Sequence, residues 1–172
     1  MIRRTKIVPY LVLIGLMLAI PSVWAGYDAG ASAYLAKDYK RALREFKADG
    51  SPPSQYVLGI MYFKGEGVDV DKGGAVKLLR ASAERGYLKA QYSLAVIYDK
   101  GDGVAQDQQE AAKWYRKAAE QGHAQSQFNL GLMYTNGEGV GKDRAEAVKW
   151  LRKSAGQGNV RAKKLLRVMG EK

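Results

Sequence analysis

Hydrophobic and polar positions recur along this chain with a period of 36 residues. Three blocks, 54–89, 90–125 and 126–161, align without a gap. The types that return are leucine, tyrosine, valine, aspartate, alanine and glycine: Leu58, Leu94 and Leu130; Tyr62, Tyr98 and Tyr134; Val68, Val104 and Val140; Asp71, Asp107 and Asp143; Ala75, Ala111 and Ala147; Ala83, Ala119 and Ala155; Gly86, Gly122 and Gly158. A fixed period of this length is typical of proteins that stack one supersecondary unit several times.

Each block predicts two helices. In the first block, Leu58, Met61 and Tyr62 follow the three-and-four spacing of a helical stripe over about residues 54–64. A Gly-Glu-Gly-Val turn then breaks this helix. The second helix begins after an aspartate, whose carboxylate accepts the free amide hydrogens of a first turn. In blocks two and three a glutamate stands three residues after that aspartate, which is a capping-box pattern. The glycines at the ends of the second helices stand where a left-handed residue terminates a helix.

The spacing of large and small residues predicts how the helices pack. Ala75 and Ala83, with their equivalents, let neighbouring helices approach closely, and Trp114 and Trp150 fill the opposite side. Leu78 takes the large position in block one. Repeated large-against-small contacts predict one continuous core of stacked helix pairs.

The segments outside the blocks predict capping elements. Residues 26–53 indicate a shorter N-terminal helix pair, separated from block one by Ser51-Pro52-Pro53. Residues 162–172 begin a fourth block and predict a single C-terminal capping helix. Such caps cover the outermost repeats of an array.

The pattern Leu-Gly-x-x-Tyr-x-x-Gly-x-Gly-Val-x-x-Asp-x-x-x-Ala-x-x-Trp resembles the Sel-one-like repeat, a 36-residue relative of the tetratricopeptide repeat. Block three shows it most fully, from Leu130 to Trp150. Block two has Ala95 in place of the glycine, and block one has Leu78 in place of the tryptophan. The resemblance implies an all-α, right-handed α–α superhelix of antiparallel helix pairs, which usually serves as an adaptor for other proteins.

The first 25 residues predict a signal peptide. Arg3 and Arg4 begin a basic segment, an apolar stretch of about 14 residues follows, and Val23-Trp24-Ala25 fits signal peptidase. We expect cleavage after Ala25 and a periplasmic or secreted protein, which touches a membrane only through this segment before cleavage. The alternative is a retained anchor, but the apolar stretch is shorter than the roughly 20 residues that span a bilayer.

Composition removes several kinds of chemistry. The 172 residues contain no cysteine and one histidine, His123. Disulfide scaffolds, cysteine nucleophiles and thiolate zinc sites are therefore excluded, and a histidine-based triad is hard to build. We expect no catalytic residues, no metal, no cofactor and no enzyme activity. The alternative is a cell-wall-acting enzyme or β-lactam-binding protein, as in some cysteine-rich relatives, although the chain also lacks a Ser-x-x-Lys motif.

The first helices predict a binding groove on the concave side. By analogy with tetratricopeptide repeats, the residues facing it are Tyr56, Ile60, Lys64, Tyr92, Val96, Lys100, Phe128, Leu132 and Asn136. An aromatic residue recurs at one groove position in every block, and the alternative is that these rings are core between repeats. The second helices carry cations that we expect to be solvated: Lys77, Arg80, Lys113, Arg116, Lys117 and Lys153.

The positive charge lies mostly at the C-terminal end. The formal net charge is +11, and residues 142–172 hold ten basic and three acidic side chains. These charges indicate either a solvated cap or a contact for an acidic protein or an anionic envelope surface. Export and the absence of interleaved aromatic residues argue against nucleic acid.

Together these features predict an exported scaffold or adaptor that binds a protein or peptide through the solenoid groove. Bacterial envelope signalling, assembly or host contact is the expected setting, and a partner of an envelope sensor kinase is one form of that role.

Overall fold

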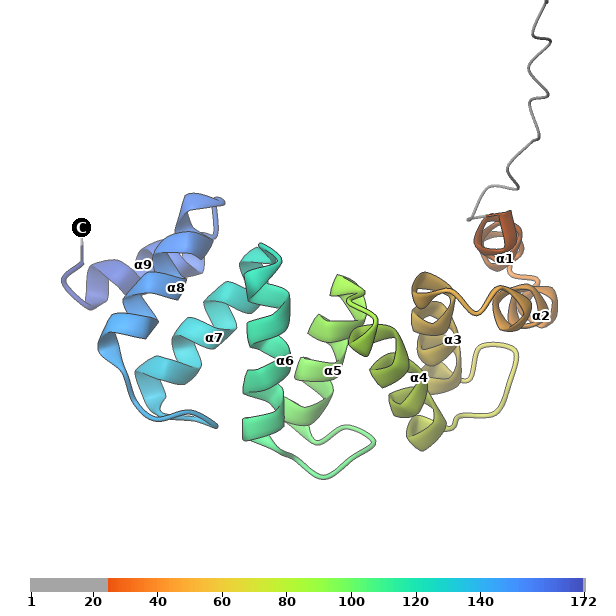
Figure 1. Cartoon of the computed structure of the whole chain (residues 1–172), viewed down its shortest axis with the longest axis horizontal. Coiled ribbons are helices and arrows are strands. Elements are labelled where there is room, and N and C mark those ends of the chain that lie inside the picture. Colours follow the sequence, from red (N-terminus) through yellow and green to blue (C-terminus); the bar gives the residue numbers. More distant parts are fainter. Residues whose placement is uncertain (1–24, 172) are drawn as a thin grey trace, which may run out of the picture.

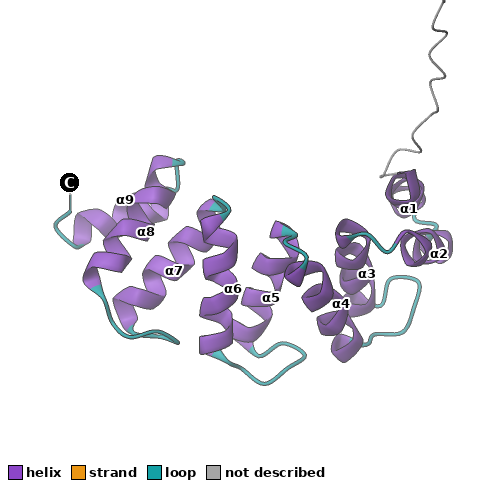
Figure 2. Ribbon diagram, in the orientation of Figure 1, coloured by secondary structure: helices purple, strands orange, loops and turns teal. Residues whose placement is uncertain are grey.

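The described part of the chain is an array of antiparallel helix pairs. The computed structural model describes residues 25–171, and helices are the only regular elements within them. They are α1 (Ala25–Leu35), α2 (Tyr39–Asp49), α3 (Pro52–Lys64), α4 (Lys72–Glu84), α5 (Leu88–Lys100), α6 (Gln108–Glu120), α7 (Ala124–Asn136), α8 (Arg144–Gly156) and α9 (Val160–Val168). The helices follow one another along the long axis, with α1 and α9 at opposite ends (Figure 1), and short loops join them (Figure 2). The predicted all-α solenoid is confirmed.

The predicted signal segment, 1–25, lies outside the described residues except for Ala25, where α1 begins. Within residues 25–171, no helix is both long and apolar enough to cross a bilayer.

The first helices begin two residues earlier than the sequence blocks do. Helix α3 begins at Pro52, so the two prolines belong to its first turn and are not a spacer. Ser51 caps this helix by accepting a hydrogen bond from the amide of Ser54. Proline suits the first turn because a backbone N–H in that turn has no acceptor within the helix, so its absence costs no hydrogen bond.

The aspartate caps of the second helices form as predicted, but the capping boxes do not. The carboxylate of Asp107 accepts a hydrogen bond from the amide of Glu110 at 2.9 Å. The Glu110 side chain does not return the contact: it accepts from the indole N–H of Trp114 at 3.0 Å, and the amide of Asp107 donates to the carbonyl of Tyr98. The same arrangement recurs in α8. The glutamate therefore orients a core tryptophan instead of closing the helix.

Most of the predicted core positions are buried, but Leu78 and Ala155 are only half-buried. Trp114 and Trp150 are each 3% exposed, and the small partner Ala75 is fully buried. The buried side chains form three clusters in succession along the array. Gly131 shows why one position must be small, since a Cβ atom there would lie 2.8 Å from Cγ of Leu151.

A ladder of side-chain amides joins one repeat to the next. Gln157 donates hydrogen bonds to the carbonyl of Gly122 at 2.9 Å and to the side chain of Gln127 at 2.8 Å. Gln127 in turn donates to the carbonyl of Ala119. The same contacts occur one repeat earlier, through Gln121. The bond to Ala119 satisfies a buried backbone carbonyl, and together these bonds fix the position of each helix pair against its neighbour.

Candidate partner-binding surface

The groove surface consists of the nine predicted residues on α3, α5 and α7. Eight of them keep some exposure: the outermost, Lys64, Lys100 and Asn136, are exposed, whereas the others are half-buried. The residues of each helix stand four positions apart, so each set lines one helical face.

Helices α3 and α5 frame a hollow of about 270 Å³, which we call the Val96 hollow. Four of the predicted groove residues line it: Ile60, Tyr92, Val96 and Lys100. The carboxylate of Asp102 also lines it and forms an ion pair with Lys72, with 2.6 Å between Nζ and Oδ1. The hollow thus has an apolar centre and charged side chains on its wall.

A second hollow, of about 360 Å³, lies between α1 and α3 and is called the Tyr56 hollow. Ile60 lines both hollows, so the two are adjacent. The Tyr56 hollow is rich in tyrosine, with Tyr27, Tyr34 and Tyr87 beside Tyr56. The rings of Tyr56 and Tyr87 pack with their centroids 5.4 Å apart.

Hydrogen bonding holds one of these tyrosines in place. The hydroxyl of Tyr34 donates to the carboxylate of Glu66, with 2.7 Å between the oxygens. This hydrogen bond, with burial and the charge of Glu66, raises the pKa of Tyr34 to about 12. Burial also raises the pKa of Tyr87. The hydroxyl of Tyr34 is thus held as a donor to Glu66.

Phe128 does not lie in an open groove. It is 4% exposed, and it clusters with Leu151 and with Leu166 of α9. The guanidinium of Arg161 covers its ring at 4.6 Å from the centroid. The prediction of an exposed aromatic in every repeat is wrong at this position, because α9 packs over the ring and phenylalanine has no polar group to keep at the surface.

His123 lies in the predicted turn but is half-buried. Its ring packs edge-on against Tyr92, with centroids 4.6 Å apart, and Nδ1 lies 2.8 Å from the hydroxyl of Ser126. Burial lowers the pKa of His123. The residue supports the position of Tyr92 in the groove surface.

The sequence analysis did not predict that α1 lines part of this candidate surface. Tyr27 and Tyr34 lie outside the 36-residue period, so the repeat gives them no equivalent position. Leu35, beside them, is 82% exposed and also lines the Tyr56 hollow. Leu35, a large apolar residue next to Tyr34, was the feature of the sequence that could have indicated this surface. Its exposure, however, depends on how the N-terminal helix pair packs.

The described residues do not gather the groups that a metal centre needs. No set of three or more His, Asp or Glu side chains within residues 25–171 could hold a metal ion. The geometry of the two hollows instead suits contact with an apolar side chain and with hydrogen-bond acceptors.

Comparison with solved structures shows the same fold. A Sel1 repeat protein from Oxalobacter formigenes is 38% identical with a TM-score of 0.73, and the match covers 77% of this chain and 56% of that one. The protein c5321, described as a protective antigen in uropathogenic Escherichia coli with an SLR fold, is 37% identical with a TM-score of 0.76, over 81% of this chain and 32% of that one. The chain thus spans about half of the first protein and a third of the second.

A more distant match supports the fold alone. Helicobacter pylori cysteine-rich protein B is 23% identical with a TM-score of 0.60, over 75% of this chain and 95% of that one. No protein of curated function matches the sequence.

The repeats themselves match a family model. The Sel1 repeat model covers residues 52–87, 88–123 and 124–159, and each match begins with the first helix of a pair. With three consecutive matches over most of its length, the chain belongs to the Sel1 repeat family.

Proposed function

We propose that this protein is an exported adaptor that binds a protein or peptide segment across the Val96 and Tyr56 hollows. Sel1 repeat solenoids generally act in protein–protein interaction. The observation that carries the proposal is the continuity of the two hollows through Ile60. Together they give a partly exposed aromatic and aliphatic strip along α3 and α5, and aromatic anchors in a concave surface are where binding energy tends to concentrate.

Two features support an extracytoplasmic place of action. The basic, apolar and small-residue segments of residues 1–25 have the order of a cleaved signal peptide. The likeness to a protein described as a protective antigen agrees with this, because such an antigen must be reachable by antibodies. The intact mass of the protein recovered from an envelope fraction tests this location. We expect the mass of a chain that begins at Gly26. A species that retains Met1 and is extracted only with detergent would contradict the proposal.

A charge placed inside the Val96 hollow tests the binding surface. Val96→Glu should abolish capture of envelope proteins by the immobilised chain, because an apolar partner side chain would meet a carboxylate. Val70→Glu is the matched control, since Val70 is 59% exposed and lies on the loop between α3 and α4, outside both hollows. Circular dichroism checks that both variants are folded at the temperature of the assay, because Val96 is half-buried against the core.

The outcome separates binding from stability. Loss of the same captured bands with Val96→Glu, but not with Val70→Glu, supports the groove. Equal capture by both variants, with both folded, shows that the partner binds elsewhere.

A further inference from the structure

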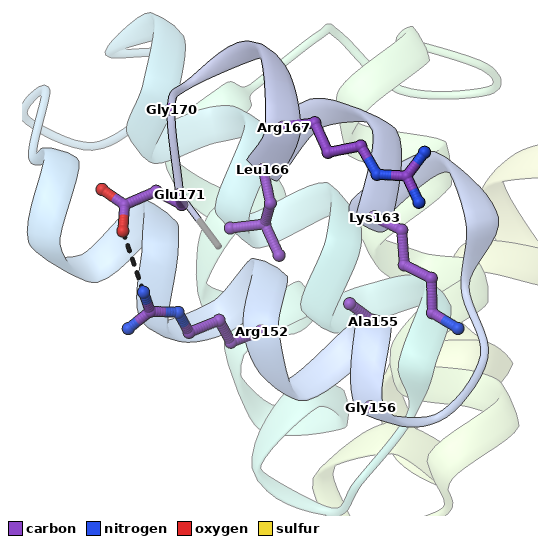
Figure 3. Close-up of a pocket in the computed structure, with 8 residues that line it drawn as sticks. All are labelled: Arg152, Ala155, Gly156, Lys163, Leu166, Arg167, Gly170 and Glu171. Atoms are coloured by element: carbon purple, nitrogen blue, oxygen red, sulfur yellow. Dashed lines mark hydrogen bonds and ion pairs between the residues drawn. The ribbon is translucent and has the colours of Figure 1, made fainter.

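The α9 end of the array carries a second, chemically distinct hollow. It has a volume of about 740 Å³ and lies between α8, α9 and Glu171. Figure 3 shows Arg152 and Glu171 on one side, Lys163 and Arg167 on the other, and Leu166 between them. We call it the α9 hollow, and it shares no lining residue with the groove surface.

Two of the three cations of this hollow stand where the preceding repeat has buried residues. Lys163 stands 36 positions after Gln127, and Arg167 stands 36 positions after Gly131. Gln127 is 4% exposed and contacts Ala119 of α6, and Gly131 is buried against Leu151 of α8, so neighbouring helices cover this face of α7. On α9 the two equivalent positions are exposed, and any polar residue would suit them. Both nevertheless carry a positively charged side chain.

These like charges repel one another. Lys163 and Arg167 are four residues apart on α9, where a pair of equal charges destabilises a helix by a few tenths of a kcal/mol. Neither residue forms an ion pair within residues 25–171. Carboxylates of a partner would relieve this repulsion, which gives the hollow a preference for one sign of charge.

The chain already places one carboxylate in this hollow. Glu171 forms ion pairs with Arg152 at 2.9 Å and with Arg144 at 3.1 Å. Its position shows that the arginine side of the hollow accepts a glutamate, while Lys163 and Arg167 remain available opposite. Leu166 and Ala155 between them provide apolar contact for a neighbouring aliphatic side chain.

We propose that the α9 hollow is a docking site for a carboxylate-rich peptide segment of a partner protein. A peptide fits better than an anionic membrane, because the cations line a concavity that a flat lipid surface does not enter and because a glutamate side chain already binds there. The site is independent of the groove, and either could fail without the other.

Fluorescence anisotropy with the full chain and a labelled Glu-Glu-Leu-Glu-Glu peptide tests the site. The parent should bind this peptide and should not bind the Gln-Gln-Leu-Gln-Gln analogue. Lys163→Gln with Arg167→Gln should weaken binding about fivefold, as expected for two partly exposed charge contacts. The matched control is Lys40→Gln with Arg44→Gln, another exposed Lys/Arg pair four residues apart, on α2, which should change binding less than about twofold.

Removal of the Glu171 carboxylate should have the opposite effect on peptide affinity. Glu171→Gln frees Arg144 and Arg152 and should tighten peptide binding about twofold or more. Glu84→Gln removes an equal charge from the exposed end of α4 and should have little effect. Unaltered binding in Glu171→Gln would contradict a competing internal ligand.

Three further results would overturn the proposal. Equal weakening by both double variants would mean a general charge effect. Binding to phosphatidylglycerol vesicles that depends on Lys163 and Arg167, without peptide binding, would assign the surface to lipid. Self-association that the Lys163/Arg167 variant abolishes would assign it to a second copy of the chain.

Discussion

The guanidinium of Arg80, on α4, donates a hydrogen bond to the hydroxyl of Tyr98, on α5, with 2.5 Å between Nη2 and Oη. Arg116 and Tyr134 make the same contact one repeat later. Both arginines also lie over the ring of the tyrosine they bind. Two of the six second-helix cations expected to be solvated, Arg80 and Arg116, are therefore links to the following repeat.

Tyr98→Phe should lower the free energy of unfolding by about 1 kcal/mol, because it removes a hydrogen bond to a charged but partly exposed group. Urea unfolding measures this. Tyr62→Phe is the matched control, since Tyr62 holds the same position in repeat 1 and its hydroxyl makes no hydrogen bond within the described residues. Equal losses in the two variants would remove the arginine contact as the cause.

Trp150 is expected to be structural. Trp150→Ala should cost roughly 3–5 kcal/mol, because the side chain is 3% exposed and its removal leaves a cavity. Trp150→Leu, which copies the residue of repeat 1 at this position, should cost distinctly less. An unchanged urea midpoint for Trp150→Ala would mean that this tryptophan is not part of the core.

Phe128 should behave as a core residue and not as a binding residue. Phe128→Ala should destabilise by about 3–5 kcal/mol, since the ring is enclosed by α9 and Leu151. Tyr92→Ala should cost less, because Tyr92 is only half-buried. The comparison of their thermal melts is decisive, and a larger loss for Tyr92→Ala would reverse this assignment.

Acid should destabilise the array through its tryptophan-bound glutamates. Burial would raise the pKa of Glu110, but hydrogen bonds from Lys113 and Trp114 and the charges of Lys113 and Arg80 outweigh it and lower the pKa from its ordinary value. A hydrogen bond from Lys149 is the main cause that lowers the pKa of Glu146. Because both carboxyls are more acidic when folded, their contribution is present above the unfolded pKa and disappears as pH falls through the folded pKa.

Urea midpoints between pH 6 and pH 3 measure this effect. The Glu110→Gln, Glu146→Gln double variant should lose less stability on acidification than the parent does. The Glu84→Gln, Glu120→Gln variant, altered at two exposed glutamates without ion pairs in the described residues, should keep the parental slope. A parental slope in the first variant would mean that other carboxyls control acid unfolding.

The 36-residue period predicted the helices and caps within each unit. It predicted less well which side chains a neighbouring helix would bury. The aspartate caps depend on contacts inside one 36-residue unit, and they were confirmed, as was the burial of Trp150. Phe128 depends on the neighbour that follows it: Tyr92 packs against His123, whereas Phe128 lies beneath Arg161. The Tyr56 hollow depends on α1, which has no counterpart in the repeat and therefore no pattern from which its packing could be predicted.

The amide ladder makes the number of units adjustable. Gln157 donates to Gln127 of its own unit and to the carbonyl of Gly122 in the preceding unit, and Gln121 makes the equivalent contacts one unit earlier, so each block carries the groups that its junctions need. A duplicated 36-residue block inserted at a boundary would meet surfaces it already complements, and each junction would contribute a similar nearest-neighbour energy. The length of such an array can thus change by whole 36-residue units while the contacts at each junction stay the same.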